Sequence, residues 1–139
     1  MKRNSRLSLA LHSLGHMAGD PDRLRTSAAI AAHAGTNPVV VKRVLGHLRG
    51  AGLLIAEKGH AGGWRLARPP QEITLADVYL ALDERLAAQD EAEEPHDCSV
   101  AHAFHHRVAT VMAEVEQTLI QKLRATTIFE IRETAEDVS

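Results

Sequence analysis

The most informative stretch of the sequence reads Lys58-Gly59-His60-Ala61-Gly62-Gly63-Trp64-Arg65-Leu66. Its glycines can adopt the positive φ angles that tight hairpin loops require, and they allow the backbone to approach another surface closely. Basic residues, Lys58 and Arg65, stand on both sides of the turn. The stretch therefore predicts a β-hairpin with strands at 53–57 and 63–67. An ordinary surface hairpin is the alternative interpretation of these residues alone.

A helix is predicted directly upstream of the hairpin. Asn37 suits an N-cap and Pro38 the first helical position, where the missing N–H of proline costs nothing. One apolar stripe runs along this helix and consists of Val41, Val44, Leu45 and Leu48. Lys42 and Arg43 lie off that stripe, so we expect an exposed basic face.

A shorter helix precedes it, capped by Thr26 or Ser27 and ended by Gly35. Two helices joined by a tight glycine turn, the second with a basic face, are typical of a helix-turn-helix. A basic helix followed by a basic hairpin is the layout of a winged helix. The helix would enter a major groove, and the hairpin tip would reach a phosphate or a minor groove.

The remaining segments complete the predicted organisation. Residues 5–18 and a segment capped by Thr74 have helical periodicity, 89–97 is an acidic linker, and 99–124 is the longest helix, with a last turn expected at 127–133. The predicted fold is mostly α with a small β-hairpin. A winged helix-turn-helix domain occupies 1–85, an acidic linker or sensor loop 86–98, and a dimerisation helix with a C-terminal tail 99–139. A helix this long is expected to pack against a second copy of the chain, with folding back on its own domain as the alternative.

Charge is divided unequally along the 139 residues. Residues 1–70 hold 11 Lys/Arg and 3 Asp/Glu, whereas residues 71–139 hold 5 Lys/Arg and 15 Asp/Glu. The first half is therefore expected to meet a polyanion, and double-stranded DNA fits the predicted fold.

Composition excludes several classes of protein. No apolar run is long enough to span a membrane, and the segment after the basic N-terminus is interrupted by polar residues, unlike a signal peptide. A single cysteine rules out an intrachain disulfide framework. The cytoplasm is therefore the expected compartment. Phosphate-binding loops and the nucleophile elbow of hydrolases are missing from the sequence, so we do not expect an enzyme.

Several strings together resemble one family. They are Arg6–His12, Gly35–Leu45, Ala51–Leu53, Gly62–Pro70 and Ile73–Tyr79. Over roughly residues 5–130 the chain resembles the bacterial winged-helix transcriptional repressors of the IscR, NsrR and CymR family. The resemblance implies a winged-helix domain, a long dimerisation helix, and binding of a homodimer to a palindromic operator.

Candidate DNA contacts follow from the expected placement of the helices and the wing. Arg43 is suited to guanine O6 and N7, Val39 or Val40 to a thymine methyl group, and Lys42 to a phosphate. Thr26 and Ser27 are expected at a phosphate because they start a helix. The full set is Thr26, Ser27, Asn37, Val39, Val40, Lys42, Arg43, Lys58, His60 and Arg65.

The signal that controls binding is sought around Cys98. The resemblance implies three cysteines, about six residues apart, in members that bind an iron–sulfur cluster, but the corresponding positions here are Ala92 and Leu86. A standard three-cysteine cluster is therefore not expected. Cys98 can act as a redox thiol, or it can join His102 and a His12 from the other subunit in an atypical cluster or metal site. It can also be inert.

A second functional class stays open from the sequence. Some winged helices serve as protein-interaction modules without specific DNA binding. Such modules usually lack a basic face, whereas Lys42 and Arg43 provide one here. The salt dependence of DNA binding separates the two classes.

Overall fold

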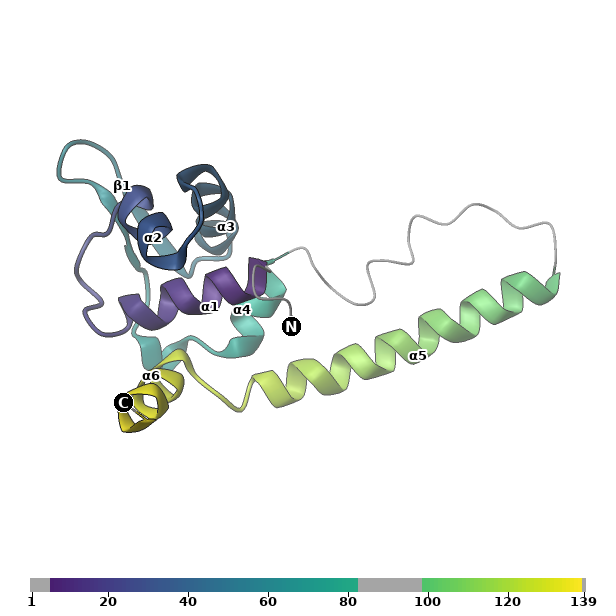
Figure 1. The fold of residues 1–139 in the computed structure, drawn as a ribbon. Coiled ribbons are helices and arrows are strands. Elements are labelled where there is room, and N and C mark those ends of the chain that lie inside the picture. The colour runs from purple at the N-terminus through teal and green to yellow at the C-terminus, as the bar shows by residue number, and fades with distance from the viewer. Residues whose placement is uncertain (1–5, 83–98, 139) are drawn as a thin grey trace.

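A computed structural model describes residues 6–82 and 99–138 of the chain (Figure 1). The helices are α1 (Arg6–Met17), α2 (Ser27–Ala34), α3 (Pro38–Gly50), α4 (Leu75–Ala81), α5 (Ser99–Leu123) and α6 (Ile128–Val138). The strands are β1 (Leu54–Glu57) and β2 (Gly63–Leu66), and a short 3₁₀ turn spans Pro70–Glu72. The predicted class, mostly helical with one small hairpin, is confirmed. The acidic segment 89–97 and Cys98 lie outside the described residues.

The boundaries of α2 and α3 are set by the capping residues that the sequence indicates. The Thr26 side chain accepts a hydrogen bond from the Ala29 N–H at 3.1 Å, and Gly35 ends α2 at φ 72°. Asn37 caps α3 through a 3.0 Å bond from the Val40 N–H, with Pro38 in the first turn. A side-chain cap satisfies an N–H that has no partner within the helix.

The hairpin forms as predicted, with each strand one residue shorter than expected. Leu54 pairs with Leu66 and Glu57 with Gly63 in antiparallel register. At the shortened end, the Ala67 N–H still donates to the Leu53 carbonyl at 3.0 Å. The turn needs glycine at position 59, where φ is 105°, a conformation that other residues rarely adopt.

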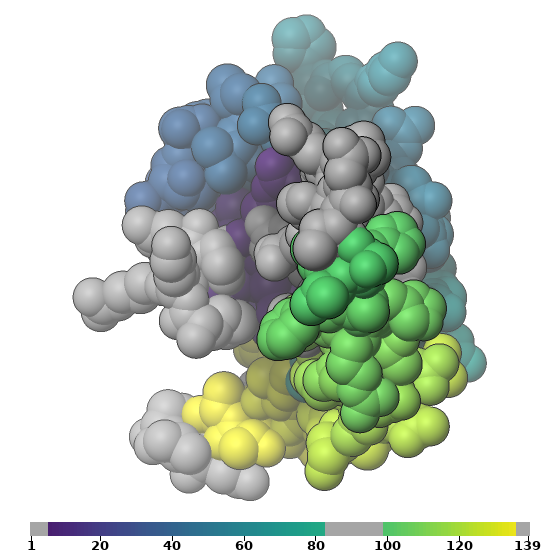
Figure 2. All heavy atoms as spheres, turned by 90° about the vertical axis from the view of Figure 1, so that its right-hand side faces the viewer, coloured from purple at the N-terminus to yellow at the C-terminus, as the bar shows by residue number. Residues whose placement is uncertain are grey.

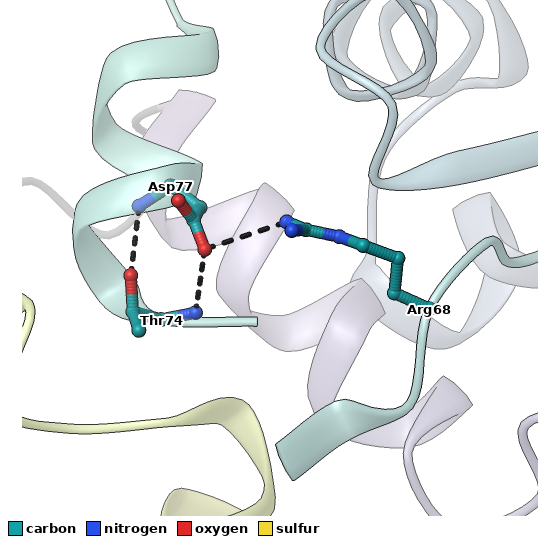
Figure 3. Close-up of polar contacts among 3 residues, drawn as sticks. All are labelled: Arg68, Thr74 and Asp77. Carbon is teal, nitrogen blue, oxygen red and sulfur yellow. Dashed lines mark hydrogen bonds and ion pairs between the residues drawn. The ribbon is translucent and has the colours of Figure 1, made fainter. Parts of the chain in front are cut away.

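The start of α4 is fixed by a reciprocal pair of hydrogen bonds (Figure 3). The Asp77 N–H donates to the Thr74 hydroxyl at 3.1 Å, and the Thr74 N–H donates to the Asp77 carboxylate at 3.0 Å. Arg68, which follows the wing, contacts the same carboxylate at 3.4 Å. The wing is thereby connected to the helix that supports α5.

The C-terminal segment forms a longer helix than the sequence predicts. Instead of one turn at 127–133, α6 runs from Ile128 to Val138 and packs against α1. Ile128 is 1% exposed, and its N–H donates to the Ile73 carbonyl at 2.9 Å. Arg132 also donates to the Gly15 carbonyl on α1 at 3.0 Å. The chain therefore returns after α5 and completes the core of the winged-helix body.

The long helix α5 projects from this body (Figure 1). Its C-terminal half is fixed to α4 by the Tyr79 hydroxyl, which donates to the buried Glu116 carboxylate at 3.3 Å. No described helix, including the 25 residues of α5, combines the length and the apolar character needed to cross a membrane.

Candidate nucleic-acid interface

One face of α3 is buried and the opposite side of its first two turns is exposed. Val41, Val44, Leu45 and Leu48 are at most 1% exposed and fix the helix to the core. Val39 is 66% exposed, and Lys42 and Arg43 are also exposed. An apolar side chain and two cations therefore face outward together near the N-terminus of the helix, where recognition helices contact bases.

Asn37 and Val40 stand at the same end of α3. Asn37 is exposed, and its side-chain carbonyl is used by the cap, so its amide group is the part able to contact a base. Val40 is 37% exposed, about half as much as Val39. Of the two valines, Val39 thus has the larger surface for a thymine methyl group.

The wing lies beside α3. Lys58 and His60 are exposed in its loop. Figure 1 shows this loop and α3 on the side of the body away from α6. The loop and the helix can therefore approach one duplex together, with the loop displaced to one side of α3.

Arg65 lies on the stem of the wing rather than at its tip. Its guanidinium pairs with Glu57 at 3.4 Å, and its side chain is 31% exposed. The carboxylate partner offsets part of the positive charge that Arg65 would present to a phosphate. The contact of Arg65 with DNA stays a prediction.

Thr26 and Ser27 are placed differently from one another. Thr26 is exposed at the N-terminus of α2, where a phosphate contact is expected. Ser27 is 8% exposed, and its hydroxyl oxygen accepts a 2.9 Å hydrogen bond from the indole N–H of Trp64. The Ser27 side chain therefore supports the wing, and a phosphate contact from it would require its backbone N–H.

Trp64 is the structural residue of the wing that the sequence does not identify. Beyond its bond to Ser27, its backbone forms a two-way bridge with Arg25: the Trp64 N–H donates at 2.8 Å and the Arg25 N–H at 3.0 Å. The segment before α2 thus pairs with β2 at one position, through the antiparallel bridge between Arg25 and Trp64. This bridge and the indole bond fix the orientation of the wing relative to the helix-turn-helix.

His12 and His102, the two predicted sensor residues that the structure describes, lie apart within one chain. His102 is exposed near the start of α5, at the end that projects farthest from the body (Figure 1). His12 on α1 lies instead beside His16 and His33. A site combining Cys98, His102 and a His12 from another subunit stays a prediction.

Two of the three grouped histidines, His12 and His16, have lowered pKa values. Burial lowers the pKa of His12, and the charge of His33 lowers it further. Burial likewise lowers the pKa of His16, followed by the charges of His33, His12, Arg25 and Arg132. Both rings therefore favour the neutral form near pH 7. The spacing of His12 and His16 by four residues on one helix was visible in the sequence, but the approach of His33 from α2 was not.

The long helix presents an apolar face to solvent. Val100, Phe104, Val108, Val111 and Val115 are 40–72% exposed and recur at helical spacing. In Figure 2, α5 (green) faces the viewer and lies in front of the winged-helix body. The half-buried Met112 and Leu119 border this stripe, since they follow Val108 and Val115 by four residues each. The five side chains of the stripe itself stay exposed in the described part of the chain.

Comparisons with known proteins agree with this fold. The sequence profile of the Rrf2 family, described as "Iron-dependent Transcriptional regulator", matches residues 3–134. YwnA of Bacillus subtilis, whose name describes an HTH-type transcriptional regulator, is 30% identical over 130 residues, covering 92% of this chain and 95% of YwnA.

Two solved structures share the fold. The structure of T. potens IscR is 21% identical with a TM-score of 0.70, over 100% of this chain and 91% of that one. CymR of B. subtilis, described as the global cysteine regulator of that organism, is 19% identical with a TM-score of 0.65, over 96% and 98% of the two chains.

Proposed function

The chain belongs to the Rrf2 family of transcriptional regulators, and from this membership we propose that it represses transcription by binding a palindromic operator as a homodimer. The observation that carries the proposal is the outward face of α3, where Val39, Lys42 and Arg43 are exposed beside the loop of the wing. The cytoplasm is the compartment in which such a protein meets bacterial DNA.

Each residue of this surface has a chemical role in the proposal. The Arg43 guanidinium donates two parallel hydrogen bonds to guanine O6 and N7, and Val39 packs against a thymine methyl group. Lys42 and Thr26 bind phosphates and fix the register of the protein on the duplex. Lys58 and His60 follow the backbone into the neighbouring minor groove, where width rather than base sequence governs binding.

The homodimer is proposed from the exposed apolar face of α5. Five large apolar side chains on one face of a single helix are unusual for a surface that stays in water. A second α5 supplies a face of the same kind, because a two-fold interface brings identical surfaces together. Two copies of α3 then face the DNA with two-fold symmetry, so the bound sequence is an inverted repeat.

We expect selection from a random pool of DNA duplexes to enrich an inverted repeat. The spacing of its half-sites should be about one helical turn, or 10–10.5 base pairs from centre to centre, or a multiple of it. Sequencing of the bound fraction after several rounds provides the measurement. Enrichment of a single unrepeated site would contradict the dimeric arrangement, and the lack of any enriched sequence would contradict specific recognition.

The signal is proposed to act separately from the DNA surface. Cys98 is the single cysteine of the chain, so any thiol-based response is assigned to it. Two mechanisms are compatible with repression that a signal relieves. One is a redox reaction of the Cys98 thiol, and the other is an atypical cluster or metal site formed with His102 and His12. A winged helix used only for protein contacts is the competing function, and the exposed Lys42 and Arg43 argue against it.

A further inference from the structure

Three histidines from two helices meet at the surface between α1 and α2. His12 and His16 lie four residues apart on α1, and His33 lies in the last turn of α2. One nitrogen from each ring can be chosen so that all three lie within 4.8 Å of one another. They line a pocket of about 240 Å³ together with Ser13, Arg25 and Ile30.

We propose that His12, His16 and His33 form a binding site for a divalent transition-metal ion of the zinc, cobalt and nickel class.

The distances between the rings fit such a site after small side-chain movements. The Nε2 atoms of His16 and His33 are 2.7 Å apart. Ligand nitrogens at about 2.0–2.1 Å from a tetrahedral zinc ion are roughly 3.3 Å apart. The His16–His33 pair must therefore open by about half an ångström, and His12 must move inward by up to about 1.5 Å.

The positions of the three side chains allow this rearrangement. His12 and His33 are exposed, so their side chains can rotate without displacing the core. His16 is half-buried and supplies the fixed ligand, and Arg25 donates to its backbone carbonyl at 3.1 Å. The site consequently needs no change in the arrangement of α1 and α2.

Protonation also favours metal binding. Imidazole coordinates a metal only in its neutral form. The lowered pKa values of His12 and His16 keep these rings neutral near pH 7. The 2.7 Å contact between His16 and His33 likewise requires one nitrogen to accept a hydrogen bond, so at least one of the two rings is neutral.

The chemistry of the ligands selects the metal class. Three imidazoles without a thiolate suit zinc, cobalt, nickel or copper better than an iron–sulfur cluster, which needs sulfur ligands. A fourth ligand would come from solvent. Arg25 and Arg132 place positive charge near His16, and because this charge opposes a divalent cation, an anion such as chloride or hydroxide would be favoured over water as the fourth ligand.

The site does not depend on DNA binding, and calorimetric titration with zinc chloride tests it directly. The full chain without an affinity tag is first treated with EDTA. We expect one zinc ion per chain. Loss of a residue that only hydrogen-bonds to a metal ligand commonly costs about 10–100-fold in metal affinity, so loss of a ligand itself in His33→Gln should weaken zinc binding by at least about tenfold.

Two variants serve as controls. His106→Gln removes an exposed histidine on α5, and Cys98→Ser removes the only thiol. His106→Gln should bind zinc as tightly as the unmodified chain. Cys98→Ser separates this site from the proposed site at Cys98, which would also use His12, and it should bind zinc as tightly because the present proposal assigns His12 to the cluster with His16 and His33. Zinc should also raise the unfolding temperature of the unmodified chain and of both controls, because the ion binds the folded state preferentially. Zinc affinity that survives His33→Gln, or that is lost in Cys98→Ser, would overturn the proposal.

Cobalt(II) provides a second measurement that does not rely on the folding of any variant. Its visible spectrum in the unmodified chain should show the d–d bands of a four-coordinate site with three nitrogen ligands and one ligand from solvent. A thiolate-to-cobalt charge-transfer band in the near ultraviolet would place the metal at Cys98 and would refute the histidine site.

Discussion

Replacing Lys42 and Arg43 together by alanine is expected to remove sequence-specific DNA binding while the fold and the dimer persist. The bidentate contact of Arg43 with guanine is worth about 1–3 kcal/mol, and it is made twice in a symmetric complex. Loss of both contacts, about 2–6 kcal/mol, weakens binding by roughly 30-fold or more, before the loss of the Lys42 phosphate contacts is counted. Gel-shift titration at fixed salt with the duplex enriched by selection measures this change.

A matched control variant tells whether the loss of binding comes from the location of the two cations on α3 or from the lower net charge of the protein. Lys122→Ala with Arg124→Ala removes the same two residue types from the last turn of α5 and from the turn that follows it, where both side chains are exposed and away from α3. This control should retain most of the affinity. Both double variants should unfold within about 0.5 kcal/mol of the unmodified chain, since the replaced side chains are exposed. Equal affinity of the two double variants would exclude α3 as the recognition helix.

Introducing two carboxylates on the exposed face of α5 is expected to separate the dimer. In Phe104→Asp with Val111→Asp, assembly would bury four unpaired charges in an apolar interface, at a cost of several kcal/mol for each. Sedimentation equilibrium should give twice the 15.1 kDa chain mass for the unmodified protein and the single chain mass for the variant. The variant should also lose cooperative binding to the inverted repeat, because each protomer then binds only one half-site.

The control for this variant lies on the same helix. Ala113 is exposed on the side of α5 opposite Phe104 and Val111, as the 100° rotation per residue requires. Ala113→Asp should therefore leave the dimer intact. A monomeric mass for the unmodified chain, or dissociation by Ala113→Asp alone, would contradict the proposed interface.

Local signals made much of the fold predictable. The caps at Thr26, Asn37 and Thr74 each depend on a residue and its neighbours three positions away, so the sequence contains the whole interaction. The glycines of the wing and the apolar stripe of α3 are equally local. For that reason the element order and most boundaries agree to within one or two residues.

Features that depend on distant contacts were not predictable. The length of α6 is set by packing on α1, through Ile128 and Arg132, and its own sequence is only weakly apolar. The burial of the Ser27 side chain depends on Trp64, 37 residues later in the chain, whose indole N–H donates to the Ser27 hydroxyl oxygen. The meeting of His33 with His12 and His16 likewise depends on how α2 crosses α1.

The salt dependence of binding to the selected duplex tests the central claim most directly. Each phosphate contact contributes about −0.9 to the slope of log affinity against log salt, so Lys42 and Lys58 in two protomers predict a slope of about −3.6 or steeper. Fluorescence anisotropy titrations at several salt concentrations give this slope. A slope of that size, reduced by about 1.8 or more in the variant lacking Lys42 and Arg43, is the predicted result. A slope near zero would contradict DNA binding through the basic face and would favour a protein-interaction module.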